Sequence, residues 1–190
     1  MGIFDFLKLS GNSKPSKKHI RFSKSALEII GTFVEQNGFT FHRKTIDRYS
    51  TNIIWRNGKS YVRIFATDFP TDYPYYFNII LGEGNSEDFF EYDWNSISIV
   101  EIGKIIKPNK KFAEFDFPKS SELQKSLELS KSQLSEFGTE FLNGNLELFY
   151  QARKMTNGER KPYRIIKKDA DGNEIINFMP ESVKQKNKFS

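Results

Sequence analysis

The sequence predicts an α+β fold with an N-terminal helix, an antiparallel sheet of four to five strands, two C-terminal helices and a closing β-hairpin. Three observations predict this class. Apolar residues recur with helical spacing in residues 26–34 and 123–141, and they alternate with polar residues in short segments between these stretches. An Asn-Gly pair at residues 57–58 lies between two of the short segments. Because helices and strands are segregated along the chain, an antiparallel sheet is favoured over a doubly wound parallel one.

The first helix is predicted from a capping pattern followed by an apolar stripe. Ser25 and Glu28 have capping-box spacing, and Asn37-Gly38 is a typical signal for a helix C-terminus. The segment before the helix is basic and begins with apolar residues 3–7. We expect this start to dock on the domain or to stay disordered. The alternative interpretation is that residues 1–9 contact a membrane surface.

The strands are predicted from alternation and from turn residues. Asn57-Gly58, flanked by Trp55 and Tyr61, is a strong hairpin signal, because both central positions of a type I′ turn need positive φ. Pro70 and Pro74 precede a further apolar segment that ends at a Gly-Glu-Gly sequence. The predicted strands are residues 39–43, 49–56, 61–67, 75–81 and 97–106.

The C-terminal part is predicted to contain two helices and a hairpin. Ser121 and Gln124 have capping-box spacing before the stripe of residues 123–141, and Gly138 inside this stripe favours a break, since glycine costs about 1 kcal/mol there relative to alanine. A shorter helix over 146–153 should stop at Asn157-Gly158. Residues 163–167 and 174–178 should then pair, and the polar tail after Pro180 is expected to fray.

One domain is expected over residues 21–180, with a flexible or docked basic segment at 1–20 and a polar tail at 181–190. The chain has 19 Phe, 8 Tyr and 2 Trp, which predicts an aromatic core. It has no cysteine, so disulfides, thiolate metal sites and a cysteine nucleophile are excluded. No apolar run approaches the ~18 residues of a membrane-spanning helix. A cytoplasmic location is expected.

No recognised catalytic, cofactor or metal motif occurs. His19 lies among basic residues and is expected to be solvated, and His42 is expected at the exposed rim of the first strand. The polar run at 169–174 is not an EF-hand loop, because Gly172 stands at position 4 instead of position 6. We therefore expect no catalytic residue, metal or cofactor, although spacing alone leaves open a Ser-His-Asp arrangement assembled by the fold.

Charge is distributed unevenly along the chain. Residues 64–103 contain eight carboxylates and no Lys or Arg, a charge of −8, whereas the whole chain carries +5. The absence of cations from the apolar segments 75–81 and 97–102 follows from their burial as strands. The informative parts are therefore the loops at residues 68–73 and 83–94.

These loops are predicted to bind a basic protein partner. Protein interfaces favour Tyr and Trp anchors, and a carboxylate rim speeds association with a basic partner. The alternative interpretation is a solvated acidic loop. The predicted partner-binding residues are Asp68, Asp72, Tyr73, Glu83, Glu87, Asp88, Glu91, Tyr92, Asp93 and Trp94, with Tyr75 and Tyr76 in the same aromatic run.

From Asp68 to Trp94 the chain resembles the small cytosolic immunity proteins of bacterial toxin systems, which often present an acidic, aromatic face to a basic nuclease toxin. The resemblance covers about a seventh of the chain, together with its size and its lack of cysteine, and it matches no motif residue by residue. It implies an inhibitor that binds a toxin in the bacterial cytoplasm and performs no chemistry.

Two other classes of function stay open. The local cluster of acids at residues 83–93 could hold a divalent cation in a metal-dependent hydrolase. The basic residues near both termini could contact phosphates of a nucleic acid if the termini meet. The leading hypothesis is a non-enzymatic protein-binding module.

Overall fold

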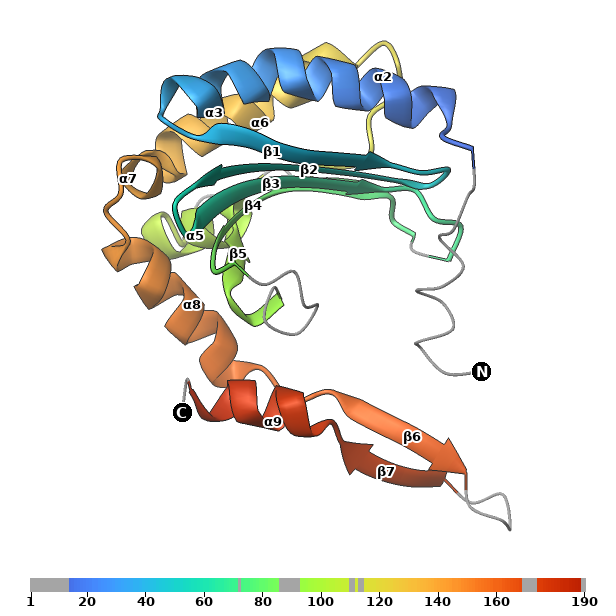
Figure 1. Cartoon of the computed structure of the whole chain (residues 1–190), viewed down its shortest axis with the longest axis vertical. Helices are drawn as coiled ribbons and strands as arrows, with labels where there is room; N and C mark the ends of the chain where they lie inside the picture. The colour runs from blue at the N-terminus through green and yellow to red at the C-terminus, as the bar shows by residue number, and fades with distance from the viewer. Residues whose placement is uncertain are drawn as a thin grey trace.

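The computed structural model describes residues 14–71, 73–85, 93–109, 112, 115–168 and 174–188, and it confirms the α+β class (Figure 1). The apolar segment at 3–7 and the loop at 169–173 lie outside the described residues. In chain order the elements are α2 (Lys17–Ala26), η1 (Leu27–Gly31), α3 (Thr32–Gln36), β1 (Thr40–Ile46), β2 (Ser50–Asn57), β3 (Ser60–Thr67), β4 (Tyr76–Glu83), β5 (Ser96–Ser98), α5 (Ile99–Ile106), α6 (Leu123–Phe137), α7 (Thr139–Leu142), α8 (Glu147–Glu159), β6 (Arg164–Lys168), β7 (Glu174–Phe178) and α9 (Pro180–Asn187).

The central sheet is antiparallel throughout and has the order β1-β2-β3-β4-β5, so each strand pairs with its neighbour in sequence. The predicted hairpin joins β2 to β3, with Asn57 paired to Ser60. Gly58 has φ +58° and lies at the first central turn position, one residue later than the Asn-Gly pair suggested. A separate two-stranded sheet, β6-β7, confirms the closing hairpin.

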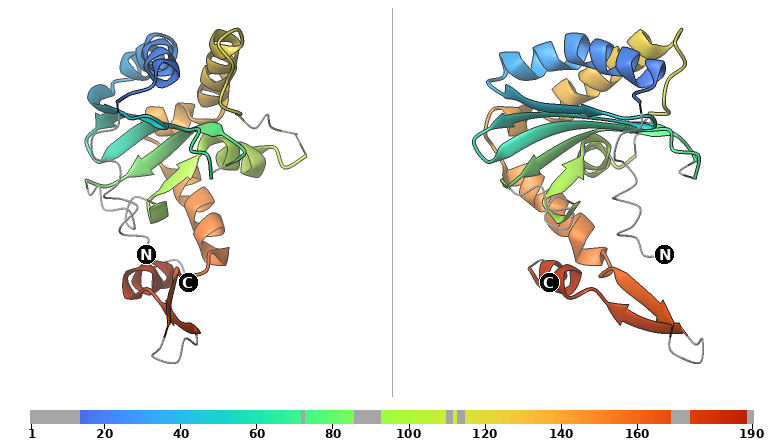
Figure 2. Two further views of the ribbon diagram at one scale, coloured as in Figure 1. Left: turned by 90° about the vertical axis from the view of Figure 1, so that its right-hand side faces the viewer. Right: turned by 45° about the vertical axis from the view of Figure 1, so that its right-hand side comes forward.

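The two faces of the central sheet differ. One face is covered by the continuous helix α2-η1-α3 and by α6, while α8 leads away on the other side toward the β6–β7 hairpin and α9 (Figures 1 and 2). The helix-covered face carries the core, because strand residues that point there are apolar and buried. These residues are Ile53, Trp55, Val62, Ile64, Ala66, Phe77, Ile79 and Leu81. Register places Asn52, Arg63 and Asn78 on the opposite face.

The first helix begins at Lys17, earlier than the predicted start at Ser25. Ser16 is the N-cap, and its hydroxyl oxygen accepts a hydrogen bond from the His19 backbone amide at 3.3 Å. The buried residues His19 and Phe22 extend the apolar stripe by two turns toward the N-terminus. The predicted start was wrong because the buried stripe includes a histidine, a residue type that is usually exposed next to lysines.

The predicted strand at 97–106 is a three-residue strand followed by helix α5. Ser98 caps this helix by accepting a hydrogen bond from the Glu101 backbone amide at 3.2 Å. The Ser-x-x-Glu pattern is a capping box, and here it outweighs the β-propensity of Ile99 and Val100.

The C-terminal elements follow the prediction with two differences. A break at Gly138 separates α6 from α7, as expected. Helix α8 continues through Asn157-Gly158 to Glu159, and the tail after Pro180 forms α9 instead of fraying. The hydroxyl of Ser182 in α9 is buried and accepts a hydrogen bond from the Tyr163 backbone amide at 2.9 Å, which fixes α9 to the start of the hairpin. None of the described helices has the length and apolar character needed to cross a membrane.

We predict opposite effects of alanine at two glycines. A Cβ at Gly82 in β4 would lie only 2.0–2.4 Å from atoms of the buried Tyr61 ring, so Gly82→Ala should lower the free energy of unfolding by about 1–3 kcal/mol. Gly158 in α8 has open space around the same position, so Gly158→Ala should raise stability by up to about 1 kcal/mol. Urea unfolding of both variants checks this. If Gly82→Ala had the same free energy of unfolding as wild type, the Tyr61 ring would not be held in place.

Candidate partner-binding surface

Within the described residues, α8 and the residues after it neutralise two carboxylates of the acidic run, Glu83 and Asp93. Asp93 receives a charge-assisted hydrogen bond from Arg160 at 2.6 Å, and the Tyr163 hydroxyl donates to the same carboxylate. The Arg160 guanidinium also lies 5.1 Å from the ring centroid of Trp94, which is fully buried. Burial and the neighbouring Asp93 carboxylate raise the pKa of Tyr163, which keeps its hydroxyl a donor.

A second contact joins the end of β4 to the middle of α8. The Glu83 carboxylate lies 3.7 Å from the Arg153 guanidinium and accepts hydrogen bonds from the Tyr150 hydroxyl at 3.0 and 3.1 Å. Burial lowers the pKa of Arg153, and Glu83 opposes this shift. The basic partners of Glu83 and Asp93 are thus side chains of this chain.

Asp68 is buried beside the first helix. Its carboxylate lies 2.9 Å from His19 Nε2 and forms an ion pair with Lys18, while His19 Nδ1 lies 2.8 Å from the Thr51 hydroxyl. We assign a neutral imidazole that donates to Asp68 from Nε2 and accepts from Thr51 at Nδ1. Burial lowers the pKa of His19 to about 4, assisted by Lys18 and opposed by Asp47. Lys18 offsets the Asp68 charge, so the cost of desolvating an imidazolium dominates.

This Thr-His-Asp cluster has the residue types of a hydrolase triad, but it cannot contact a substrate in this structure. The side chains of His19 and Asp68 are 0% and 2% exposed, and Thr51 is fully buried. The cluster instead fixes α2 to β2 and to the end of β3. The expectation that His19 is solvated was therefore wrong, because its partner Asp68 lies 49 residues away in sequence. His42 is exposed, as expected.

The predicted binding residues separate into four groups. Tyr73 is 81% exposed. Glu83 and Asp93 are half-buried and bound to α8 or its C-cap. Asp68 and Trp94 are buried, so their side chains do not belong to an open surface, and this part of the prediction is corrected. Asp72, Glu87, Asp88, Glu91 and Tyr92 lie outside the described residues.

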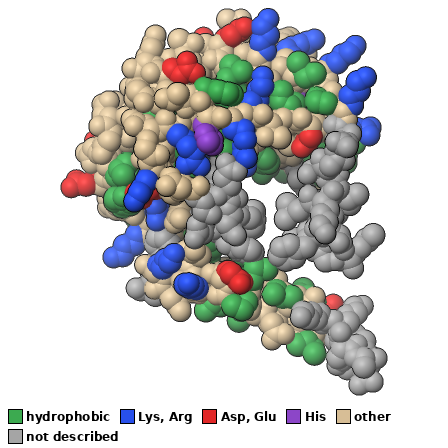
Figure 3. All heavy atoms as spheres, in the orientation of Figure 1, with side chains coloured by type: hydrophobic (Ala, Val, Ile, Leu, Met, Phe, Trp, Pro, Cys, Tyr) green, Lys and Arg blue, Asp and Glu red, His purple; other side chains and the backbone are tan. Residues whose placement is uncertain are grey.

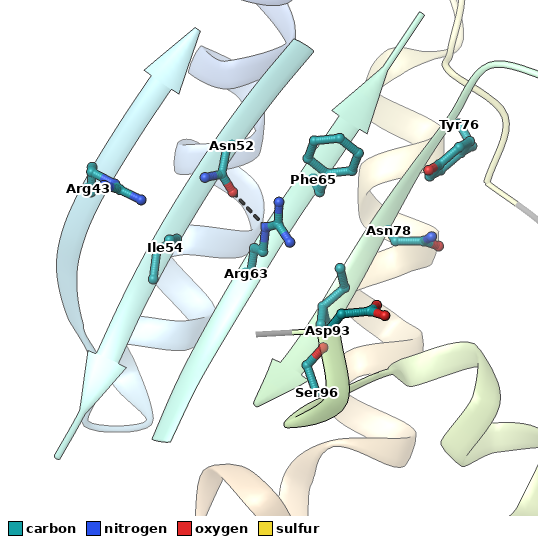
Figure 4. A pocket seen from close by; sticks show the side chains of 10 residues that line it. Arg43, Asn52, Ile54, Arg63, Phe65, Tyr76, Asn78, Asp93 and Ser96 are labelled. Carbon is teal, nitrogen blue, oxygen red and sulfur yellow. Dashed lines mark hydrogen bonds between the residues drawn. The ribbon is translucent and has the colours of Figure 1, made fainter. Parts of the chain in front are cut away.

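The open face of the sheet carries a pocket of about 390 Å³ (Figure 4). Arg63 lies at its centre, where its Nε donates to the Asn52 side-chain oxygen at 2.7 Å and its guanidinium lies 4.7 Å from the Phe65 ring centroid. The sequence indicates the polar residues on this open face, because strand alternation places polar residues of β2, β3 and β4 on the side opposite the core isoleucines. The other lining residues are Arg43, Ile54, Tyr76, Asn78, Ile80, Asp93 and Ser96.

A second hollow, of about 470 Å³, lies beside the start of β4, and we refer to it as the tyrosine groove. Tyr73 and Tyr75 meet edge to face in it, with ring centroids 5.6 Å apart. Asp116 comes next to Tyr75, because residues 115–117 pair with the edge of β4: the Phe117 amide donates to the Tyr75 carbonyl at 2.9 Å. The groove is lined by Tyr73, Pro74, Tyr75, Asp116, Phe117, Pro118, Lys119, Glu122 and Ser126.

The carboxylates of the tyrosine groove differ from those near α8. Asp116 and Glu122 are exposed, and within the described part of the chain neither forms an ion pair. Sequence reasoning missed both because they lie outside the cation-free run. Two exposed aromatic rings beside two carboxylates can accept a cationic side chain through ring faces and charge together.

The described residues give little support to a metal-dependent hydrolase or to a nucleic-acid-binding protein. Within them, no group of three or more His, Asp or Glu side chains could hold a metal ion. The basic residues of α2 lie above the sheet, while α9 lies below it beyond α8, so these two basic segments do not meet (Figures 1 and 2). Comparisons of the chain with protein-family models, with curated proteins and with solved structures each found no match.

We predict that His19 makes stability depend on pH. Its folded pKa of about 4 lies below the ordinary value of 6.5, so between these values the unfolded chain binds more protons. The stabilisation is complete above about pH 6.5 and falls by up to about 3 kcal/mol as the pH drops toward 4. Urea unfolding at several pH values should show that the difference in free energy of unfolding between wild type and His19→Gln shrinks as the pH falls from about 6.5 to 4. A difference independent of pH would contradict the assignment of a neutral imidazole.

We also predict measurable coupling between Asp93 and Arg160. In a double-mutant cycle with Asp93→Asn and Arg160→Gln, the coupling free energy should be about 1 kcal/mol and should fall as salt rises, since both side chains are partly exposed. The Glu101–Lys104 pair on α5 is the control, because it is a more exposed helical pair with an expected coupling of about 0.3 kcal/mol. Equal coupling for the two pairs would show that the contact with Arg160 gives no extra stability.

Proposed function

We propose that the chain is a non-enzymatic protein-binding module whose partner places basic side chains in the tyrosine groove. The observation that carries this proposal is the combination of exposed rings and exposed carboxylates. Tyr73 is 81% exposed and contacts Tyr75, and Asp116 and Glu122 line the same groove. Tyrosine anchors bury much area with few rotatable bonds, and carboxylates beside them select for positive charge.

One aromatic ring of the groove, that of Phe117, already has a cation of this chain nearby. The ammonium of Lys18 lies 5.8 Å from the ring centroid of Phe117, which also lines the groove. Lys18 approaches from the α2 side, where Asp68 holds it. A basic residue of the partner would make the equivalent contact with Tyr73 or Tyr75, with Asp116 or Glu122 in the place that Asp68 takes for Lys18.

We propose that this binding neutralises a basic toxin, in the way that the resemblance to bacterial immunity proteins implies. The support is the size of the chain and the two exposed carboxylates that lie beside exposed tyrosines in the groove. The partner's cations are expected at Asp116 and Glu122, because Glu83 and Asp93 already contact Arg153 and Arg160. An inhibitor of this kind acts by covering its target and needs no catalytic group, and it would work in the bacterial cytoplasm.

The proposal predicts that two groove variants lose the partner. Immobilised wild-type chain should capture a basic protein from its native source at low salt, and Tyr73→Ala should weaken that binding by about tenfold or more, as expected for an interface anchor. Asp116→Lys should slow association and remove most of its salt dependence. Both side chains are exposed, so neither change should alter the free energy of unfolding by more than about 0.5 kcal/mol.

Glu140→Lys is the matched control, because Glu140 is an exposed acid on α7 and makes the same change of net charge away from the groove. It should bind as wild type does. Capture of no basic protein, or equal binding by wild type, Tyr73→Ala and Asp116→Lys, would refute the proposal.

A further inference from the structure

Two arginines lie in one row on the open face of the central sheet. Register pairs Arg43 with Ile54, Ile54 with Arg63, and Arg63 with Ile80, so this row crosses β1, β2, β3 and β4. Neighbouring strands are about 4.8 Å apart, which places the backbones of the two arginines about 10 Å apart. Both side chains line the pocket of about 390 Å³, and Arg43 extends from β1 over β2 toward it (Figure 4). We refer to it as the arginine pocket.

Arg63 is held in a fixed orientation at the centre of the arginine pocket. Its Nε donates to the side-chain oxygen of Asn52 at 2.7 Å, and its guanidinium lies 4.7 Å from the ring centroid of Phe65. A side chain that is already oriented loses less conformational entropy when a ligand binds to it. The planar guanidinium can hold a carboxylate or a phosphate through two parallel hydrogen bonds. Arg63 is therefore preorganised to bind an oxyanion.

The described residues of the pocket favour a negatively charged occupant. They include two arginines and one acid, Asp93. The Asp93 carboxylate accepts hydrogen bonds from Arg160 at 2.6 Å and from the Tyr163 hydroxyl, so Arg160 offsets its charge. Charge complementarity therefore favours an anion in the arginine pocket, whereas the tyrosine groove favours a cation.

An aromatic wall with amides beside it completes the pocket. Register sets Phe65 between Asn52 and Asn78, and the Tyr76 ring centroid lies 6.3 Å from that of Phe65. Tyr76 is 37% exposed, so part of its ring can pack against a flat ring of a ligand. Asparagine amides both donate and accept hydrogen bonds, and they can orient polar atoms at the edge of such a ring. The volume of the pocket is also in the range of small-molecule sites.

We propose that the arginine pocket binds a small molecule that carries a carboxylate or phosphate group on a flat ring. The oxyanion lies between Arg63 and Arg43, and the ring packs against Tyr76 with Asn78 at its edge. This binding is separate from the capture of a basic partner, because the described lining residues of the pocket and of the tyrosine groove do not overlap. Either site can therefore fail its test while the other stands.

Titration of the full, ¹⁵N-labelled chain followed by NMR tests this site with phenyl phosphate and benzoate. Inorganic phosphate and acetate are the matched anions without a ring, and benzamide is a ring without charge. At least one aromatic anion should shift the side-chain amide signals of Asn52 and Asn78 with a dissociation constant of about 1 mM or lower. Its ringless counterpart should bind at least about tenfold more weakly, because it makes no contact with Tyr76, and benzamide should give no saturable shift.

Substitution of the arginines should weaken binding of the tighter aromatic anion. We expect a loss of at least about tenfold for Arg63→Gln and of about threefold for Arg43→Gln, because Arg43 is exposed and contributes less. Arg43→Gln also keeps the test decisive if the half-buried Arg63 is needed for folding. Tyr73→Ala, which alters the tyrosine groove, should bind the anion as wild type does.

General attraction of anions to a basic surface has to be separated from binding in the pocket. Lys and Arg side chains gather at the top of the molecule, where α2 lies (Figure 3). Arg48→Gln is the matched control, because Arg48 is an exposed arginine between β1 and β2 and is not among the described residues that line the pocket. It should bind the aromatic anion as wild type does.

Three results would overturn the proposal. One is the absence of a saturable shift with either aromatic anion up to about 10 mM. The second is a ringless anion that binds as tightly as its aromatic counterpart. The third is binding by Arg63→Gln and Arg43→Gln that is as tight as binding by Arg48→Gln.

Discussion

Trp55 lies between β2 and the first helix, with its ring fully buried and its Nε1 donating to Glu35 at 3.0 Å. A Cβ at Gly31 would lie 2.9 Å from this ring, so the missing side chain sets how closely the π-helical turn η1 approaches the sheet. That approach lets Ile30 and Val34 pack over the sheet as fully buried residues of the core. The packing of the first helix on the covered face of the sheet depends on this contact.

Charge has a different role in the folded chain from the one that its distribution along the sequence suggests. A run without Lys or Arg looks like a surface for a foreign cation, yet Asp68, Glu83 and Asp93 each meet a cation of the same chain. These cations come from α2 and from α8 and its C-cap, on either side of the run in sequence. Among the described carboxylates of the run, these three therefore hold α2, α8 and the α8 C-cap against the sheet and the loops that leave it. The groove carboxylates Asp116 and Glu122 lie outside the run.

The parts of the fold that could be predicted from sequence are those that local signals determine. The β2–β3 hairpin follows from the residues of its turn, and the break after α6 follows from Gly138. Helix α5 was missed although Ser98 and Glu101 gave a local capping signal, because the isoleucines after Ser98 were read as a strand.

The parts that could not be predicted depend on contacts between distant residues. His19 is buried because Thr51 and Asp68 reach it from 32 and 49 residues away. Of the candidate site, Tyr73 was predicted from its aromatic neighbours. Asp116 reaches Tyr75 only through the pairing of residues 115–117 with β4, and no pattern in the sequence indicates that pairing.

The pairing of residues 115–117 also limits how a partner can bind. Strand β5 has three residues and pairs with Ile80–Gly82 only. On the side of β4 away from β3, the first half of β4 therefore has no described strand beside it. The Phe77 amide donates to the Phe115 carbonyl at 2.9 Å, and the Phe117 amide donates to the Tyr75 carbonyl, so this segment occupies backbone groups that an added strand would use. Binding by strand addition is blocked at that edge. Recognition beside β4 must therefore proceed through side chains, and its specificity must come from the chemistry of the residues that enter the groove.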